Sequence, residues 1–254
     1  MPTLLSPPAP LPDLRVPPGA RAPPPLPILF FHGVGLGVTP YLHFVRSLTK
    51  TYPGHAMILL EVPHVSLRWS SKGATPVEAV VAEAVAALDA LGAPRACVIA
   101  HSYGTFCAAQ LLSHHRARVA SLAVIDPVCM LACYPRLLAN FIYRRPGLDN
   151  LTSLAGAMDM ARYAVSRDLL VAHCFCRQFN WSALAIWPQD LPDRALVVLA
   201  GGDDLVPSPA VERYMHVVGR GRDVLYNPDL GHAGFLLFPG WQKRVIAAMH
   251  DLLE

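Results

Sequence analysis

Short runs of apolar residues recur along this chain and alternate with segments whose apolar residues follow helical spacing. The first run is Ile28–Phe31, and a helical pattern follows over Tyr41–Thr51. Runs that are apolar at every position are typical of strands buried on both faces, because a half-exposed strand alternates apolar and polar residues. The later runs predict further strands at residues 56–62, 97–100, 121–126, 196–200 and 223–226.

A helix is predicted from Thr75 to about Leu91. Thr75 is suited to be its N-cap, Pro76 fits the first turn, and Glu78 would complete a capping box. Helical patterns also follow most of the other predicted strands. Buried strands that alternate with helices indicate an α/β fold, with a mostly parallel central sheet and helices on both faces.

Two segments depart from this alternation. Residues 1–25 are rich in proline, which predicts an extended, poorly ordered leader. An inert linker or a weak targeting sequence is favoured there over a docking segment for a partner domain. Residues 26–254 then form one domain, since α/β domains of this length are common. Within it, residues of about 127–193 are rich in aromatic residues and cysteine, and they predict a helical lid inserted over the strand ends.

The strongest local pattern is a strand that ends in His-Ser-Tyr-Gly at 101–104 and continues into a helix. A serine between a strand and a helix is typical of a nucleophile elbow, in which the serine occupies a sharp turn. Such a turn packs tightly and needs small residues two positions before and after the serine. Here Ala100 and Gly104 flank Ser102 in this way. The alternative is that Ser102 is an ordinary helix N-cap.

A serine hydroxyl becomes a strong nucleophile when a base takes its proton. The chain contains eleven histidines, and His232 is the favoured base because it follows a glycine in a loop after the last predicted strand. His32 and His101 adjoin the serine and are interpreted as structural or oxyanion-loop neighbours. The remaining histidines lack a supporting motif.

The base needs a carboxylate to orient it. Asp203 and Asp204 both follow the fifth predicted strand, and Asp203 is favoured, with Asp204 as the alternative acid. Asp126, after the fourth strand, is a third position for the acid. The resulting order along the chain is serine, aspartate, histidine, each after a strand of one presumed sheet. This order differs from those of chymotrypsin and subtilisin.

An oxyanion needs two N–H donors. Tyr103, the residue after the serine, would provide one, and Val34, in the glycine-rich loop 32–37, would provide the other. That loop lacks the Gly-Lys-Ser/Thr ending of a nucleotide-binding P-loop. The six cysteines show no paired zinc-ligand spacing and predict buried free thiols in a reducing compartment. No metal and no other cofactor is therefore expected.

Taken together, these residues resemble the α/β-hydrolase superfamily, of the AB hydrolase-1 type, over roughly Leu26–Leu253. More narrowly, the chain is similar to uncharacterised fungal and algal members, which implies no known substrate. It departs from the usual pattern at Ala100, where glycine is more common. Dehalogenases and epoxide hydrolases resemble the same fold but carry aspartate in place of Ser102. The segments that carry the resemblance are 31–35, 101–105, 126–128, 140–144, 179–181 and 231–232.

The motifs and the resemblance together predict a serine hydrolase that cleaves the carboxylic ester, or a related acyl bond, of a small-molecule substrate. The aromatic residues of the predicted lid favour an apolar acyl group, although they could equally form the core of the lid itself. The alternatives are an acyltransferase, or a non-catalytic receptor or scaffold of the same fold, since a fold does not fix a function.

The composition limits the classes of molecule that the protein is expected to bind. The net charge is +3 and no basic cluster stands out, which argues against nucleic-acid binding. Only 15% of the residues are charged, and the mean hydropathy of +0.35 leaves room for peripheral contact with a membrane or lipid. Neither a secretory signal nor a membrane-spanning segment is predicted, so a cytoplasmic or organellar location is expected. The sequence does not indicate the oligomeric state.

Overall fold

The computed structural model describes residues 25–68, 71, 73–147 and 153–254, so nearly all of the predicted leader lies outside the described residues. Its centre is a six-stranded sheet in which each neighbouring pair of strands is parallel. Each predicted strand is confirmed to within one or two residues at its ends. The strands are β1 (Ile28–Phe31), β2 (Met57–Leu60), β3 (Ala96–His101), β4 (Val119–Ile125), β5 (Ala195–Ala200) and β6 (Val224–Asn227).

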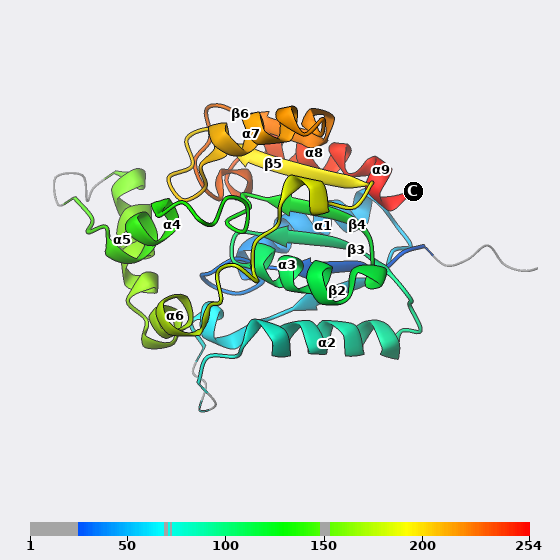
Figure 1. Ribbon diagram of the computed structural model, residues 1–254, viewed down its shortest axis with the longest axis horizontal. Helices are drawn as coiled ribbons and strands as arrows, with labels where there is room; N and C mark the ends of the chain where they lie inside the picture. Colours follow the sequence, from blue (N-terminus) through cyan, green and yellow to red (C-terminus); the bar gives the residue numbers. More distant parts are fainter. Residues whose placement is uncertain (1–24, 69–70, 72, 148–152) are drawn as a thin grey trace, which may run out of the picture.

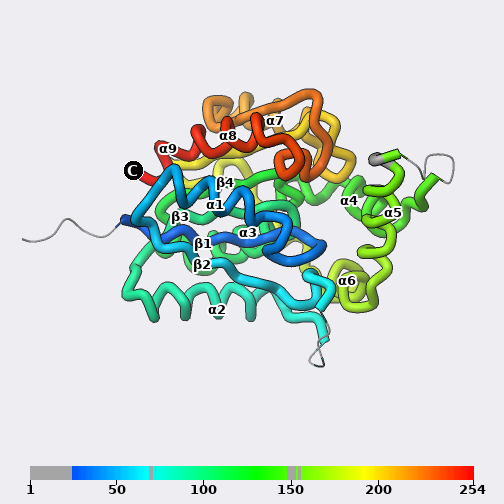
Figure 2. Tube along the Cα trace, turned by 180° about the vertical axis from the view of Figure 1, so that it is seen from behind, coloured from blue at the N-terminus to red at the C-terminus, as the bar shows by residue number. Residues whose placement is uncertain are grey.

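Helices cover both faces of the sheet (Figures 1 and 2). One face packs against α2 (Val77–Ala90), α3 (Gly104–His114) and α7 (Ser208–Val217). The other packs against α1 (Leu42–Thr51), α8 (Pro239–Ala248) and α9 (His250–Leu253). Successive residues of a strand point to opposite faces, and both faces are covered here. This is why β1 is apolar at all four positions and fully buried.

The order of the strands across the sheet is β2-β1-β3-β4-β5-β6. The chain therefore moves outward from β1 to β2 and then returns to the other side of β1 with β3. The strand order reverses between β1 and β3, and in open α/β sheets ligands bind beyond the carboxyl ends of the strands at such a point. The loop that contains Val34 follows β1, and Ser102 follows β3, so both predicted site residues lie at this reversal.

The segment between β4 and β5 is largely helical, and its described residues up to Gln178 stand beyond the carboxyl ends of the strands (Figure 1). Its last part returns along α3, where Arg116 Nη1 donates to the Asp190 carbonyl. The segment supplies no strand to the sheet among its described residues. Its elements are α4 (Arg136–Leu138), η4 (Ala139–Tyr143), α5 (Leu154–Ser166), α6 (Leu169–His173), η6 (Cys174–Gln178) and η7 (Pro188–Asp190).

Short helical turns complete the described part of the chain. They connect strands and helices and add no further layer. They are η1 (Thr39–Tyr41), η2 (Pro63–Ser66), η3 (Arg116–Arg118), η8 (Gly221–Asp223) and η9 (Gly234–Leu236). Of the helices that the structure describes, none has both the length and the apolar character needed to cross a bilayer.

The predicted start of α2 is wrong by one residue. Pro76 occupies the N-cap position with extended backbone angles, and no side chain caps the helix. Since the helix begins only at Val77, Thr75 lies one position before the N-cap and Glu78 is the second helical residue, so the two are not placed for a capping box.

The cysteines are also less uniform than predicted. Four thiols are buried, but Cys133 and Cys176 are exposed. Cys133 belongs to a turn after β4, and Cys176 lies on η6 beside Cys174 and Phe175, which take the buried side of that turn.

Candidate active site

Ser102 occupies the sharp turn between β3 and α3. Its φ of 50° lies in the left-handed region, which a residue with a side chain rarely adopts. The turn is held on both sides, because the Ser102 N–H donates to the Ile125 carbonyl over 3.0 Å and its carbonyl accepts from Thr105 N–H over 2.8 Å. A side chain at Gly104 would collide with the Phe31 carbonyl. The surrounding structure therefore fixes a strained turn at the strand end, and the serine hydroxyl there contacts His232.

Three of the predicted site residues form a continuous hydrogen-bonded chain. Ser102 Oγ lies 2.8 Å from Nε2 of His232, and His232 Nδ1 lies 2.7 Å from Oδ2 of Asp203. A carboxylate only accepts hydrogen bonds, so it selects the imidazole tautomer that carries hydrogen on Nδ1. Nε2 is then free to accept the proton of the serine hydroxyl.

Asp203 is held by more than the histidine. The side chain is buried, and its second oxygen, Oδ1, accepts the N–H groups of Leu205 over 2.7 Å and Val206 over 2.9 Å. Burial alone would raise the pKa of the Asp203 carboxyl, but His232 and these two amides lower it below its ordinary value. Asp203 is therefore a carboxylate with a fixed orientation toward the histidine.

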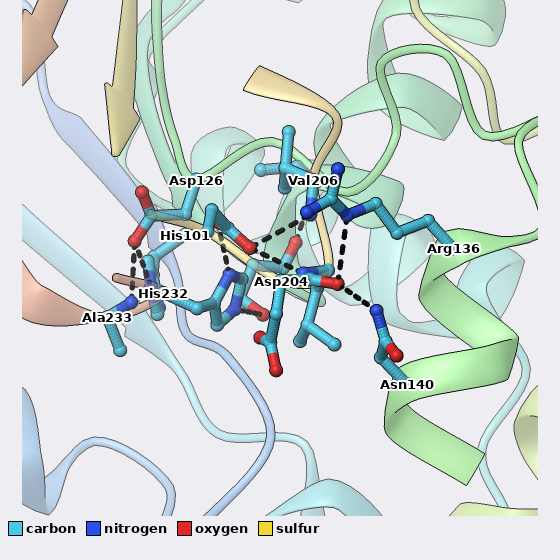
Figure 3. Close-up of polar contacts among 12 residues, drawn as sticks. His101, Asp126, Arg136, Asn140, Asp204, Val206, His232 and Ala233 are labelled. Atoms are coloured by element: carbon cyan, nitrogen blue, oxygen red, sulfur yellow. Dashed lines mark hydrogen bonds and ion pairs between the residues drawn. The ribbon is translucent and has the colours of Figure 1, made fainter. Parts of the chain in front are cut away.

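Asp204 contacts a different part of the molecule (Figure 3). Its carboxylate pairs with Arg144 at 2.5 Å, and its backbone carbonyl accepts from Asn140 Nδ2 at 2.5 Å and from Arg136 Nε at 3.3 Å. All three partners belong to the helical segment between β4 and β5. Asp204 thus joins that segment to the loop after β5, whereas Asp203 makes the contact with His232.

Asp126 lies close to His232 without bonding to its ring in the described structure. Its Oδ2 accepts the N–H of the next residue, Ala233, over 2.8 Å. One potential metal-ligand atom from each of Asp126, Asp203 and His232 lies within 4.8 Å of the other two, a spacing that could also suit a metal ion. Each of these groups already has a hydrogen-bond partner within the protein. Hydrogen bonds within the protein therefore account for the positions of these three side chains.

The surrounding carboxylates set the charge preference of the histidine. Burial by itself would lower the pKa of His232. Asp203 opposes this strongly, with smaller contributions from Asp126 and Asp204, and raises the pKa of His232 to about 9. The site therefore stabilises an imidazolium, which is the state that a histidine reaches after it takes a proton from serine.

The loop after β1 lies against the serine. A Cβ on Gly33 would come within 3.0 Å of Ser102 Cβ, so the two backbones approach closely. The Gly33 N–H donates to the Tyr41 hydroxyl over 2.8 Å. In the described part of the chain, the N–H groups of Val34 and Tyr103 have no hydrogen-bond partner. These are the two predicted oxyanion donors.

The aromatic residues of the helical segment pack mostly against α3. Phe106 of α3 lies 4.9 Å from Phe179 and 5.7 Å from Trp181 between ring centroids, and Phe141 lies 5.0 Å from Phe175. These contacts form a core between the segment and α3, whereas the second interpretation of the aromatic residues was a core within the lid itself. Tyr143 and Trp187 are instead 67% and 40% exposed.

Tyr41 was missed as part of the site. The sequence shows it only as an apolar position at the start of a helix. Its hydroxyl, however, contacts Gly33 and lies 2.6 Å from Nδ1 of His101. No local motif marks this role, because the three residues belong to separate segments of the chain.

Known proteins share this architecture. The sequence model described as "Alpha/beta hydrolase family" matches residues 28–247. No significant match was found among curated protein sequences.

Solved structures provide more distant likenesses. The meta-cleavage product hydrolase CumD of Pseudomonas fluorescens IP01 is 15% identical, with a TM-score of 0.61 over 89% of this chain and 91% of the other. A bacterial membrane phospholipase A is 18% identical, with a TM-score of 0.59 over 90% and 79%. The monoacylglycerol lipase of Paleococcus ferrophilus is 14% identical, with a TM-score of 0.56 over 87% and 94%. At these identities the likeness establishes the fold.

The match to the sequence model covers most of the chain, and the structural likenesses extend over the same sheet and helices. The chain therefore belongs to the alpha/beta hydrolase family.

Proposed function

We propose that this protein is a serine hydrolase that cleaves a carboxylic ester, or a related acyl bond, through Ser102, His232 and Asp203. The observation that carries the proposal is the pair of hydrogen bonds of 2.8 Å and 2.7 Å that joins the three side chains. This is the geometry in which a base can activate a serine and a carboxylate can orient the base.

In the proposed reaction, His232 Nε2 takes the proton of Ser102 as Oγ attacks the acyl carbonyl carbon. The N–H groups of Tyr103 and Val34 stabilise the resulting oxyanion. His232 then protonates the departing alcohol and leaves an acyl-enzyme on Ser102. A water molecule, deprotonated by the same histidine, attacks this intermediate and releases the acid.

The free N–H of Val34 supports its place in this scheme. Gly33 is the other candidate donor in the same loop, but its N–H is already bonded to Tyr41. Tyr103 begins the turn into α3, where amide groups and the helix dipole favour negative charge. The two proposed donors therefore come from the loops on either side of the point where the strand order reverses.

We further propose that residues 127–193 act as a lid over this site and that the substrate is a small molecule with an apolar acyl group. The position of the described residues up to Gln178 beyond the strand ends supports the lid. Two structures that resemble this chain are named as a membrane phospholipase A and a monoacylglycerol lipase. The narrower resemblance to uncharacterised fungal and algal members remains a prediction and points to no substrate.

A fluorophosphonate probe tests the proposal without knowledge of the substrate, because it phosphonylates an activated serine. The purified wild-type protein is expected to react, with the adduct on Ser102 by mass spectrometry. Ser102→Ala and His232→Ala are expected to abolish the reaction. His115→Ala, at an exposed histidine outside the site, serves as the matched control and should react normally. A folded wild-type protein that does not react would leave the receptor or scaffold interpretation in its place.

The rate of this labelling should depend on pH. The base must be neutral to accept the serine proton, and the pKa of His232 is raised to about 9. The labelling rate is therefore expected to increase from pH 6 upward and to level off on the alkaline side of the ordinary histidine value. Loss of the Asp203 charge removes the main cause of the rise, so Asp203→Asn should shift the midpoint downward. A midpoint at or below 6.5 in the wild type would contradict this expectation.

A further inference from the structure

A buried histidine lies directly beneath the proposed nucleophile. His101 ends β3, immediately before Ser102, and its side chain is only 3% exposed. One ring nitrogen, Nδ1, is 2.6 Å from the Tyr41 hydroxyl. The other, Nε2, lies 3.4 Å from Oδ2 of Asp126 and makes no hydrogen bond in the described structure. His101 therefore lies between two polar groups that belong to different loops.

The hydrogen positions on Tyr41 and His101 follow from the pKa values and hydrogen-bonding partners of the two side chains. Burial raises the pKa of Tyr41, so its hydroxyl keeps its single proton, and burial lowers the pKa of His101, so the imidazole is neutral. Tyr41 accepts the Gly33 N–H and can direct its own proton only toward His101 Nδ1. The remaining hydrogen of His101 is then on Nε2, the ring nitrogen that lies 3.4 Å from the Asp126 carboxylate.

The series of contacts through Tyr41, His101 and Asp126 ends on both sides beside the proposed reacting groups. At one end, Gly33 precedes Val34, the proposed oxyanion donor. At the other end, Asp126 accepts the N–H of Ala233, which follows His232. Asp126 and Ala233 both have positive φ angles, 46° and 60°, so this contact joins two unusual turns (Figure 3). The contact fixes the loop that carries the proposed base.

We propose that Tyr41, His101 and Asp126 are positioning residues that couple the loop of the oxyanion donor Val34 to the loop of the base His232. The inference rests on the proposed function, since it concerns the alignment of those two groups around Ser102. The coupling has a physical reason: a displacement of about 1 Å at a reacting group can lower a rate about 100-fold. Hydrogen bonds hold Gly33 and His101 to Tyr41 and hold Ala233 to Asp126, and the buried contact between His101 and Asp126 connects the two sides.

The first test removes one hydroxyl. Tyr41→Phe keeps the ring in its apolar contacts but leaves the Gly33 N–H and His101 Nδ1 without a partner. The measurement is fluorophosphonate labelling, resolved into the probe's binding constant KI and its maximal rate kinact. We expect kinact to fall about 10- to 100-fold with KI changed less than about threefold, because the probe still binds but meets a misplaced donor.

Tyr52→Phe is the matched control. Tyr41 and Tyr52 flank the same helix, since Tyr41 is the N-cap of α1 and Tyr52 is its C-cap. The Tyr52 hydroxyl donates to the Ile246 carbonyl over 3.0 Å, away from the site. It is expected to lower the thermal midpoint without a change in kinact. A Tyr41→Phe variant that loses thermal stability but keeps wild-type kinact would assign the chain a purely structural role and overturn the inference.

The second test addresses the coupling. Asp126→Ala removes the acceptor of the Ala233 N–H and should lower kinact, whereas Asp126→Asn keeps an oxygen there, tolerates the positive φ and should restore most of the rate. In the double variant Tyr41→Phe/Asp126→Ala, the loss of kinact is expected to be smaller than the product of the two single losses. A fully multiplicative loss would show two independent contacts and overturn the coupling.

The wild-type result separates this inference from the proposed function. If the wild-type protein does not label, the proposed function fails and the inference fails with it. If the wild type labels on Ser102 while Tyr41→Phe and Asp126→Ala label at the wild-type kinact, only the inference fails.

Discussion

Asp203→Asn is expected to lower the rate of serine labelling and of ester hydrolysis about 10⁴-fold, with little change in substrate binding. Asparagine fills the same space, but its amide group can donate to His232 Nδ1 and so favours the wrong tautomer of the imidazole. The proton would then be on Nε2, where it blocks the acceptance of the Ser102 proton. The measurement is kcat on a p-nitrophenyl ester series, together with kinact for the fluorophosphonate.

Asp204→Asn is the matched control for this prediction. It removes the charge that pairs with Arg144, and both of these side chains are 36% exposed. Ion pairs at such exposed positions contribute about 1 kcal/mol or less. We therefore expect kcat to change less than about threefold. A large loss in Asp204→Asn combined with a small loss in Asp203→Asn would assign the acid to the other residue.

The fold was accessible from the sequence because burial on both faces leaves a strong pattern. Strands such as β3 and β5 are apolar at nearly every position, since helices cover each side of the sheet. The exact ends of the helices were harder to predict from the sequence. The start of α2 depends on where the backbone turns after Pro76, and a plausible capping pattern did not decide this.

The meeting of Ser102, His232 and Asp203 could also be anticipated from the sequence. Each follows a strand, and parallel strands bring their carboxyl ends to one edge of the sheet. The choice between the two adjacent aspartates was harder. It depends on which carboxylate the turn directs inward, and this is fixed by the amides of Leu205 and Val206, whose positions no local motif reveals.

The chain of Tyr41, His101 and Asp126 could not be anticipated. These residues lie on a helix, at the end of β3 and after β4, and only the packing of the three elements brings them together. The aromatic residues of the helical segment illustrate a related limit. Their sequence is compatible with a substrate pocket or with a core. Three of them contact Phe106 and a fourth, Phe141, contacts Phe175, so these four form a core.

Gly104→Ala is expected to lower the free energy of unfolding by more than about 3 kcal/mol. The added Cβ would collide with the carbonyl group of Phe31, which is backbone of β1 and cannot rotate away. Overpacking against side chains costs about 1–3 kcal/mol, and a collision with the backbone of a central strand is expected to exceed that range. Urea denaturation followed by circular dichroism gives the change.

Gly240→Ala tests whether the effect belongs to the elbow or to glycine replacement in general. Gly240 lies in the first turn of α8, and an added Cβ there meets no atom within 4 Å. Alanine is the better helix former, so stability should change by less than about 1 kcal/mol, in the stabilising direction. If Gly104→Ala were equally neutral, α3 could move away from β1 without cost. The close approach of β1 and α3 would then not be what fixes Ser102 at its strained φ.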